Sequence, residues 1–220
     1  MPFSQATLDF LFANRLHNSR EWFQEHKKEY QQLVIAPLQE LVRRLTPVML
    51  EIDREVTTEP RVDRTISRIW RDTRYSHDKS FYRDNMWIIF KRGKMHGTQV
   101  PGLHFELTQS GFNYGCGFYH ASPAYMERLR AQLLAAAPPA RQALERYQSQ
   151  SCFVLEGDRY ARPHFPEQPE ALQEWLERRN IGFCCESSDA GLLFSDRLAD
   201  KLAEDFRLLA PIYRFLLYVA

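Results

Sequence analysis

The sequence has 220 residues, of which 44% are hydrophobic and 26% are charged. These fractions are typical of globular domains and exclude the disordered and fibrous classes. The longest apolar runs, at 86–90 and 215–220, are far shorter than the roughly 20 residues that cross a bilayer, and no secretory signal pattern is present, so we expect a cytoplasmic protein with no membrane partner.

The first third of the chain predicts helices. Ser4 can cap a helix with apolar residues at helical spacing, and Asn18 with Glu21 has the pattern of a capping box that starts a second helix. Pro37 suits the first turn of a helix better than its interior, so we expect a restart there and an apolar stripe through Met49. Periodicity leaves the segment 61–75 open between helix and strand.

The middle of the chain predicts strands, and the last part predicts mostly helices. Aromatic and branched residues are frequent in three segments separated by glycine-containing turns, at 86–92, 103–108 and 111–118. Helices are expected at 122–136, from Pro138 to 147, at 172–179 and from Ser195 to 218, with short strands at 153–155 and 181–185. We therefore predict an α+β protein, a single domain over residues 1–220, in which helices from the N- and C-terminal parts pack on a largely antiparallel central sheet.

The cysteines and histidines show no metal-binding motif. The four cysteines include no C-x-x-C pair, and the seven histidines include no close pair such as H-E-x-x-H. The sequence thus predicts reduced thiols, no metal site and no cofactor. A site formed across neighbouring strands by His104, Cys116 and His120 is a minor alternative.

Positive charge is concentrated in one segment. The net charge is +1, but residues 61–94 hold ten Lys or Arg and four Asp or Glu, a local charge of +6, which leaves −5 for the rest of the chain. A basic block in an otherwise acidic protein indicates either an anionic partner or an internal network of ion pairs.

The segment 68–82 is the densest part of this basic block. The predicted anion-binding residues are Arg68, Arg71, Arg74, Lys79 and Tyr82, with Asp72, His77 and Asp78 in support. Arginine suits bidentate recognition of phosphate or carboxylate, lysine acts as a movable point charge, and the hydroxyls of Tyr82 and Ser76 could donate to the same anion. His77 is a candidate base. Aromatic residues between the charges could form the walls of a pocket.

The same segment resembles a known family signature. It reads Arg71-Asp72-x-Arg74-x-Ser76-x-Asp78-Lys79-x-x-Tyr82, and it is accompanied by Asn18-x-x-x-Trp22-Phe23 with Tyr30 following, by Gly115-x-Gly117-Phe118 and by Tyr160-x-Arg162-Pro163. Together these motifs resemble the family known as domain of unknown function 2461. The resemblance implies an α+β fold and supplies no established activity.

Three functions remain open from the sequence. The first is a pocket, with or without catalysis, for a small phosphorylated or carboxylated molecule. The second is a structural or protein-interaction module in which the same charges form internal salt bridges. The third is weak nucleic-acid binding, against which the near-zero net charge and the acidic remainder argue. The sequence leaves the oligomeric state open as well.

Overall fold

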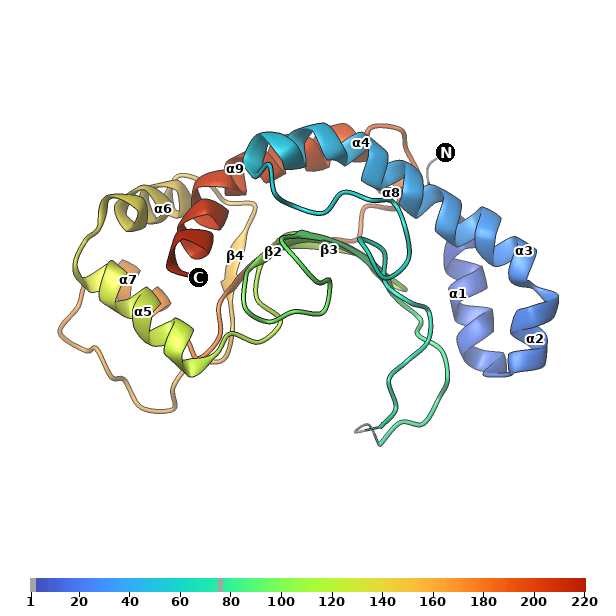
Figure 1. Ribbon diagram of the computed structural model, residues 1–220, viewed down its shortest axis with the longest axis horizontal. Helices are drawn as coiled ribbons and strands as arrows, with labels where there is room; N and C mark the ends of the chain where they lie inside the picture. Colours follow the sequence, from blue (N-terminus) through green and yellow to red (C-terminus); the bar gives the residue numbers. More distant parts are fainter. Residues whose placement is uncertain (1–2, 75–76) are drawn as a thin grey trace.

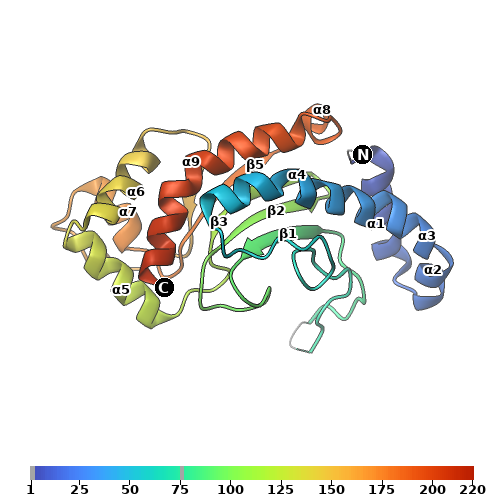
Figure 2. The ribbon, with the colours of Figure 1, turned by 45° about the horizontal axis from the view of Figure 1, so that its top comes forward.

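The computed structural model describes residues 3–74 and 77–220 and contains one antiparallel sheet covered by helices on one face. The strands, in spatial order, are β1 (Met86–Lys91), β2 (Gly102–Thr108), β3 (Gly111–Gly117), β5 (Gly182–Ser187) and β4 (Val154–Glu156). Two long helices, α4 (Ala36–Ile52) and α9 (Leu198–Val219), lie across the sheet, and Figures 1 and 2 show no helix formed by the described residues on its opposite face. The predicted α+β class is confirmed.

Alternation along the strands directs apolar side chains to the helices. In β2, Leu103, Phe105 and Leu107 are fully buried, whereas His104 and Glu106 between them are partly exposed. Successive side chains of a strand point to opposite faces, so the buried set lies under α4 and α9 and the polar set lies on the open face. Cys116 of β3 belongs to the buried set, which separates it from His104. Among the described residues, no three His, Cys, Asp or Glu side chains are placed to hold a metal ion.

A buried ion pair ties the two covering helices to the sheet. Asp53, which follows α4, accepts hydrogen bonds from Arg92 after β1 (Nε to Oδ2, 2.8 Å) and from the hydroxyl of Tyr213 in α9 (2.9 Å). Burial by itself would raise the pKa of Asp53, but hydrogen bonds from Arg92, from the backbone of Glu55 and from Tyr213 outweigh it, and the pKa lies below its usual value. The ionised carboxylate therefore stabilises the folded state.

The N-terminal helices form an arm at one end of the molecule (Figure 1). They are α1 (Gln5–His17), α2 (Arg20–Glu25), the short α3 (Lys27–Glu29) and the π-helix η1 (Tyr30–Ile35), which leads into α4. Ser4 is the N-cap of α1, as predicted. The predicted cap of α2 was wrong by one residue, because Ser19 accepts the hydrogen bond from the Trp22 amide (3.2 Å) while Asn18 ends α1 in the left-handed conformation (φ 48°).

The π-helix lies directly before Pro37. Its wider turn is shown by the Ala36 amide, which donates to the carbonyl of Gln31, five residues earlier. A proline ring clashes with the carbonyl four residues before it in an α-helix, and a π-turn relieves this clash. The predicted restart at Pro37 is therefore a change of helix type inside a continuous helical rod, and α4 continues past Pro47 to Ile52.

The remaining helices lie at the other end of the sheet or beside α9. They are α5 (Pro123–Leu134), α6 (Pro138–Gln148), α7 (Glu170–Leu176) and α8 (Ala190–Leu193). The sequence did not predict α8, and the predicted cap of the last helix was wrong, because Ser195 donates from its hydroxyl to Leu192 at the end of α8 (2.9 Å). In the described part of the chain, no helix has both the length and the apolar character needed to cross a membrane.

Two glycines of β3 are required by close approach of β5. A Cβ on Gly115 would lie 1.9 Å from the carbonyl oxygen of Phe183, and Gly117 has a φ of +145° that L residues rarely adopt. The motif Gly115-x-Gly117 therefore serves strand pairing in the sheet.

Candidate functional site

Within the basic block, the segments 69–74 and 77–83 run antiparallel and project from the sheet on the side of the N-terminal arm (Figure 1); we call them the hairpin. Its stem is closed by the Arg71 amide donating to the Phe81 carbonyl and by the Arg83 amide donating to the Ile69 carbonyl, both at 2.8 Å. Trp70 and Tyr82 lie opposite each other between these two bonds, with ring centroids 4.4 Å apart. Side chains approach most closely at such a non-hydrogen-bonded position, which explains the contact.

Tyr82 is fully buried behind Trp70. Its ring also contacts Phe23 of α2, with centroids 5.1 Å apart. The Tyr82 hydroxyl is buried, and within residues 3–74 and 77–220 it has no hydrogen-bond partner. The structure thus places Tyr82 in an aromatic cluster inside the base of the hairpin.

Arg71 and Asp78 meet in a cluster that fastens the hairpin to α1. Asp78 accepts hydrogen bonds from Arg71 and from Arg15, and Arg15 also donates to the backbone carbonyl of Tyr82 (3.1 Å). The pKa of Asp78 is held well below its usual value by the hydroxyl and amide of Ser80, with Arg15 and Arg71 adding to the effect. Nearby, the Phe81 amide donates to the side chain of Asn18 (2.6 Å).

The exposed outer part of the hairpin carries four of the predicted residues: Asp72, Arg74, His77 and Lys79. Arg74 pairs with Asp72 (Nη2 to Oδ2, 2.7 Å), and its hydrogen bonds lower the pKa of Asp72 to about 2. The Lys79 ammonium donates to the carbonyl of Thr73 (2.8 Å). Ser76, the second predicted hydroxyl donor, lies outside the described residues.

Arg68 lies apart from these groups, at the base of the hairpin. Its Nε donates to Asp63, and its two terminal guanidinium nitrogens form no hydrogen bond within residues 3–74 and 77–220. Asp63 adopts a left-handed conformation (φ 65°) in a tight turn that its amide closes by donating to the Ile66 carbonyl (3.0 Å). Aspartate tolerates this conformation better than most residues, because its short polar side chain can hydrogen-bond locally.

Arg68 borders a groove of about 350 Å³ between the N-terminal arm and the segment 62–70. We call it the Trp70 groove. Its lining residues are Phe23, Gln24, Lys27, Tyr30, Gln31, Val62, Asp63, Arg68, Ile69 and Trp70. Of the five predicted anion-binding residues, this lining includes Arg68.

The Trp70 groove combines aromatic walls with two cations. Phe23, Tyr30 and Trp70 supply the rings, Lys27 comes from the arm, and Arg68 comes from the hairpin side. Lys27 is exposed and forms no ion pair with any residue that the structure describes. One wall includes the start of a π-helix, a feature that is frequent at functional sites. A concave, mostly apolar site with a few polar groups is typical of small-molecule binding.

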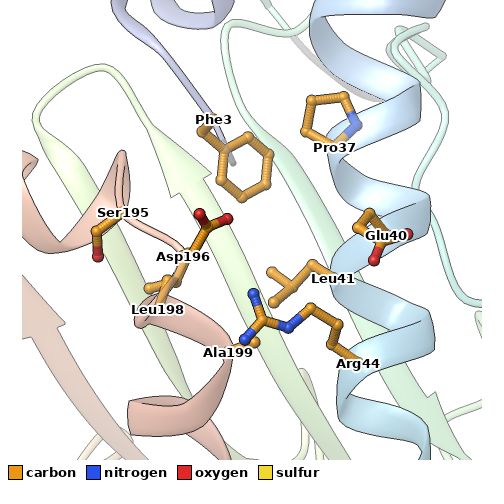
Figure 3. Close-up of a pocket in the computed structure, with 9 residues that line it drawn as sticks. All are labelled: Phe3, Pro37, Glu40, Leu41, Arg44, Ser195, Asp196, Leu198 and Ala199. Atoms are coloured by element: carbon orange, nitrogen blue, oxygen red, sulfur yellow. The ribbon is translucent and has the colours of Figure 1, made fainter. Parts of the chain in front are cut away.

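A second concavity lies between α4 and the start of α9 (Figure 3). Its lining comprises Phe3, Pro37, Glu40, Leu41, Arg44, Ser195, Asp196, Leu198 and Ala199. Its volume of about 70 Å³ is a fifth of that of the Trp70 groove and lies well below the roughly 300–1,000 Å³ found for small-molecule sites. The Trp70 groove is therefore the better candidate for a ligand site.

Several residues of these sites were not predicted from the sequence. Lys27, Gln24 and Gln31 carry no local motif, and Arg15, the partner of Asp78, is 63 residues away in the chain. One signal was present: Phe23 and Tyr30 belong to a segment that resembles the same family as the basic block, so the two segments could have been expected to meet.

The fold and the hairpin define a mixed α+β protein in which helices cover one face of an antiparallel sheet. Residues 6–215 match the family model described as "Conserved hypothetical protein (DUF2461)", so the chain belongs to this family. The resemblance seen in the motifs is thereby confirmed. No curated protein matches the chain.

Proposed function

We propose that the protein binds a small molecule bearing a phosphate or a carboxylate in the Trp70 groove. The observation that carries this proposal is the presence of Lys27 and Arg68 on the two walls of one concave, aromatic-lined site. Asp63 holds the Nε of Arg68, so the ends of the guanidinium remain available to an anion. With one carboxylate and two cations, the groove has a local charge of +1.

The other charges of the basic block support the hairpin under this proposal. Asp78 already accepts hydrogen bonds from Arg15, Arg71 and Ser80, and Arg74 pairs with Asp72. These contacts favour the structural alternative for the outer part of the block. We therefore divide the block into Arg68, which binds the ligand, and a network that fixes the shape of the hairpin.

A thermal-shift screen against phosphorylated and carboxylated metabolites tests the proposal. A molecule that binds the folded state raises the melting temperature, and the gain in stability grows with the logarithm of the ratio of its concentration to its Kd. For the strongest ligand found, we expect Arg68→Gln to weaken binding at least tenfold, about 1.4 kcal/mol. Binding should also weaken as salt is added, because the cations lie at the open rim of the groove.

The chain offers matched controls for both cations. Arg64 has the same side-chain exposure as Arg68, 59%, and pairs with one acidic residue, Glu59, but it does not line the groove. Lys28 neighbours Lys27 and is also exposed. Arg64→Gln and Lys28→Gln should leave the affinity unchanged. Equal effects of Arg64→Gln and Arg68→Gln would show that the anion binds elsewhere.

A further inference from the structure

We propose that the ligand of the Trp70 groove is nucleotide-like, with a planar heteroaromatic ring joined to the anionic group. This inference rests on the proposed function, since it assigns the part of the same ligand that extends beyond Lys27 and Arg68. It is argued from the surface of Trp70, from the polar groups beside it and from the size of the groove.

Trp70 presents a supported aromatic surface to the groove. One side of the indole packs on Tyr82 (4.4 Å between centroids), and Phe23 meets it edge-on (5.6 Å, 70° between planes). Trp70 nevertheless remains 36% exposed, and it lines the groove. Because the buried rings already fix its orientation, a ligand ring that stacks on Trp70 gains contact area at little cost in side-chain entropy.

Polar groups next to this surface favour a ring with nitrogen or oxygen atoms on its edge. Tyr30 lines the groove and is 6% exposed, and its hydroxyl forms no hydrogen bond with the described residues. Burial raises the pKa of Tyr30, so the hydroxyl keeps its proton and can donate. Gln24 and Gln31 add amides that both donate and accept. A purely hydrocarbon ring would leave the Tyr30 hydroxyl unpaired and would offer nothing to the exposed amides of Gln24 and Gln31, whereas a nucleobase can bond with all three.

The size of the groove also exceeds that of an isolated anion. At about 350 Å³ it falls within the range of roughly 300–1,000 Å³ found for small-molecule sites. A phosphate held by Lys27 and Arg68 would fill one end only. The exposed part of Trp70 would stay in contact with water, and its burial by a ring supplies additional affinity.

Calorimetric titration of the full chain with matched probes tests the inference. The probes are the four common nucleoside monophosphates, ribose 5-phosphate (anion without ring), adenosine (ring without anion) and phenyl phosphate (ring without a polar edge). We expect at least one nucleoside monophosphate to bind at least tenfold more tightly than ribose 5-phosphate, adenosine and phenyl phosphate. Trp70→Leu should remove the gain over ribose 5-phosphate, and Trp70→Phe should retain most of it.

The possible outcomes separate the two proposals. If ribose 5-phosphate binds as tightly as every nucleotide, the proposal of a heteroaromatic ring is refuted and the proposal of anion binding stands. If adenosine equals the nucleotides and Arg68→Gln has no effect, anion binding is refuted, and this inference fails with it. If no probe binds, the inference is refuted, and the metabolite screen decides anion binding separately. Should Trp70→Leu not fold, the indole N–H resonance of Trp70 gives the same test, because it should shift with the nucleotide and not with ribose 5-phosphate.

Discussion

Replacement of Tyr82 by phenylalanine should stabilise the protein. Tyr82 is fully buried, and its hydroxyl has no hydrogen-bond partner in the part of the chain that the structure describes. A buried hydroxyl without a partner costs about 1–3 kcal/mol, whereas the small space left by its removal costs a few tenths. The net expectation is a gain of about 1 kcal/mol, which for a protein of this length raises the melting temperature by about 2–4 °C.

Tyr114→Phe is the matched control with the opposite sign. Tyr114 is equally enclosed, but its hydroxyl donates to Asp205 (2.6 Å), so its removal leaves a buried carboxylate short of a partner. We expect a loss of about 1–3 kcal/mol. Urea unfolding followed by circular dichroism measures both changes. The urea concentration at the midpoint should shift, and the slope of the free energy against urea concentration should stay the same.

Two results would refute this account of Tyr82. A Tyr82→Phe protein less stable than the wild type would mean that the hydroxyl has a partner in the folded state. A tenfold loss of affinity of Tyr82→Phe for the ligand found in the metabolite screen, with stability unchanged, would show that the hydroxyl binds the anion, as the sequence predicts. Under the structural account, affinity is retained in Tyr82→Phe and falls in Tyr82→Ala, which removes the ring that supports Trp70.

Other substitutions test the sheet and the hairpin. Asp53→Asn should lower the free energy of unfolding by about 3 kcal/mol at pH 7. This is the low end of the range for breaking a buried ion pair, because the Arg92 side chain is 35% exposed. Since the pKa of Asp53 is lower in the folded than in the unfolded state, its contribution is complete above about pH 4 and is lost at lower pH, so urea midpoints from pH 2 to 7 should vary less in this variant. Gly115→Ala should cost about 3 kcal/mol or prevent folding, because of the clash with Phe183, and normal stability would show that the two strands can separate. Asp78→Ala should speed tryptic cleavage within the hairpin with little change in melting temperature, and an unchanged cleavage rate would show that its ion pairs do not hold the hairpin.

The sequence predicted the elements whose periodicity is long and regular. The strands at 86–91, 102–108 and 111–117 and the helices α5 and α6 lie within about two residues of their predicted positions, and α1 begins directly after its predicted cap, Ser4. The errors have identifiable causes. α8 is only four residues long, and Asn18 and Ser19 are both good caps, a choice that is decided by a distant amide, that of Phe81.

The candidate site was harder to predict because its parts meet only through tertiary contacts. Sequence density identified the segment 68–82, but neighbouring side chains of a hairpin strand point to opposite faces, which separates Arg71 from Trp70. The second wall of the groove comes from Phe23 to Gln31, about 40 residues earlier. Neither composition nor spacing shows that these segments face each other.

The π-helix before Pro37 fixes the rotational phase between the groove and the core. In an α-helix each residue turns the chain by about 100°, so the extra residue of a π-turn rotates everything before it by about that angle relative to everything after it. Lys27 and Tyr30 line the groove in this phase, while Leu38 and Leu41 are buried in the core. The length of this segment is thus constrained more strictly than its composition. Exchange of one apolar residue for another within 33–35 preserves both faces, whereas deletion of a single residue would turn one wall of the groove away from Arg68 and leave the helix intact.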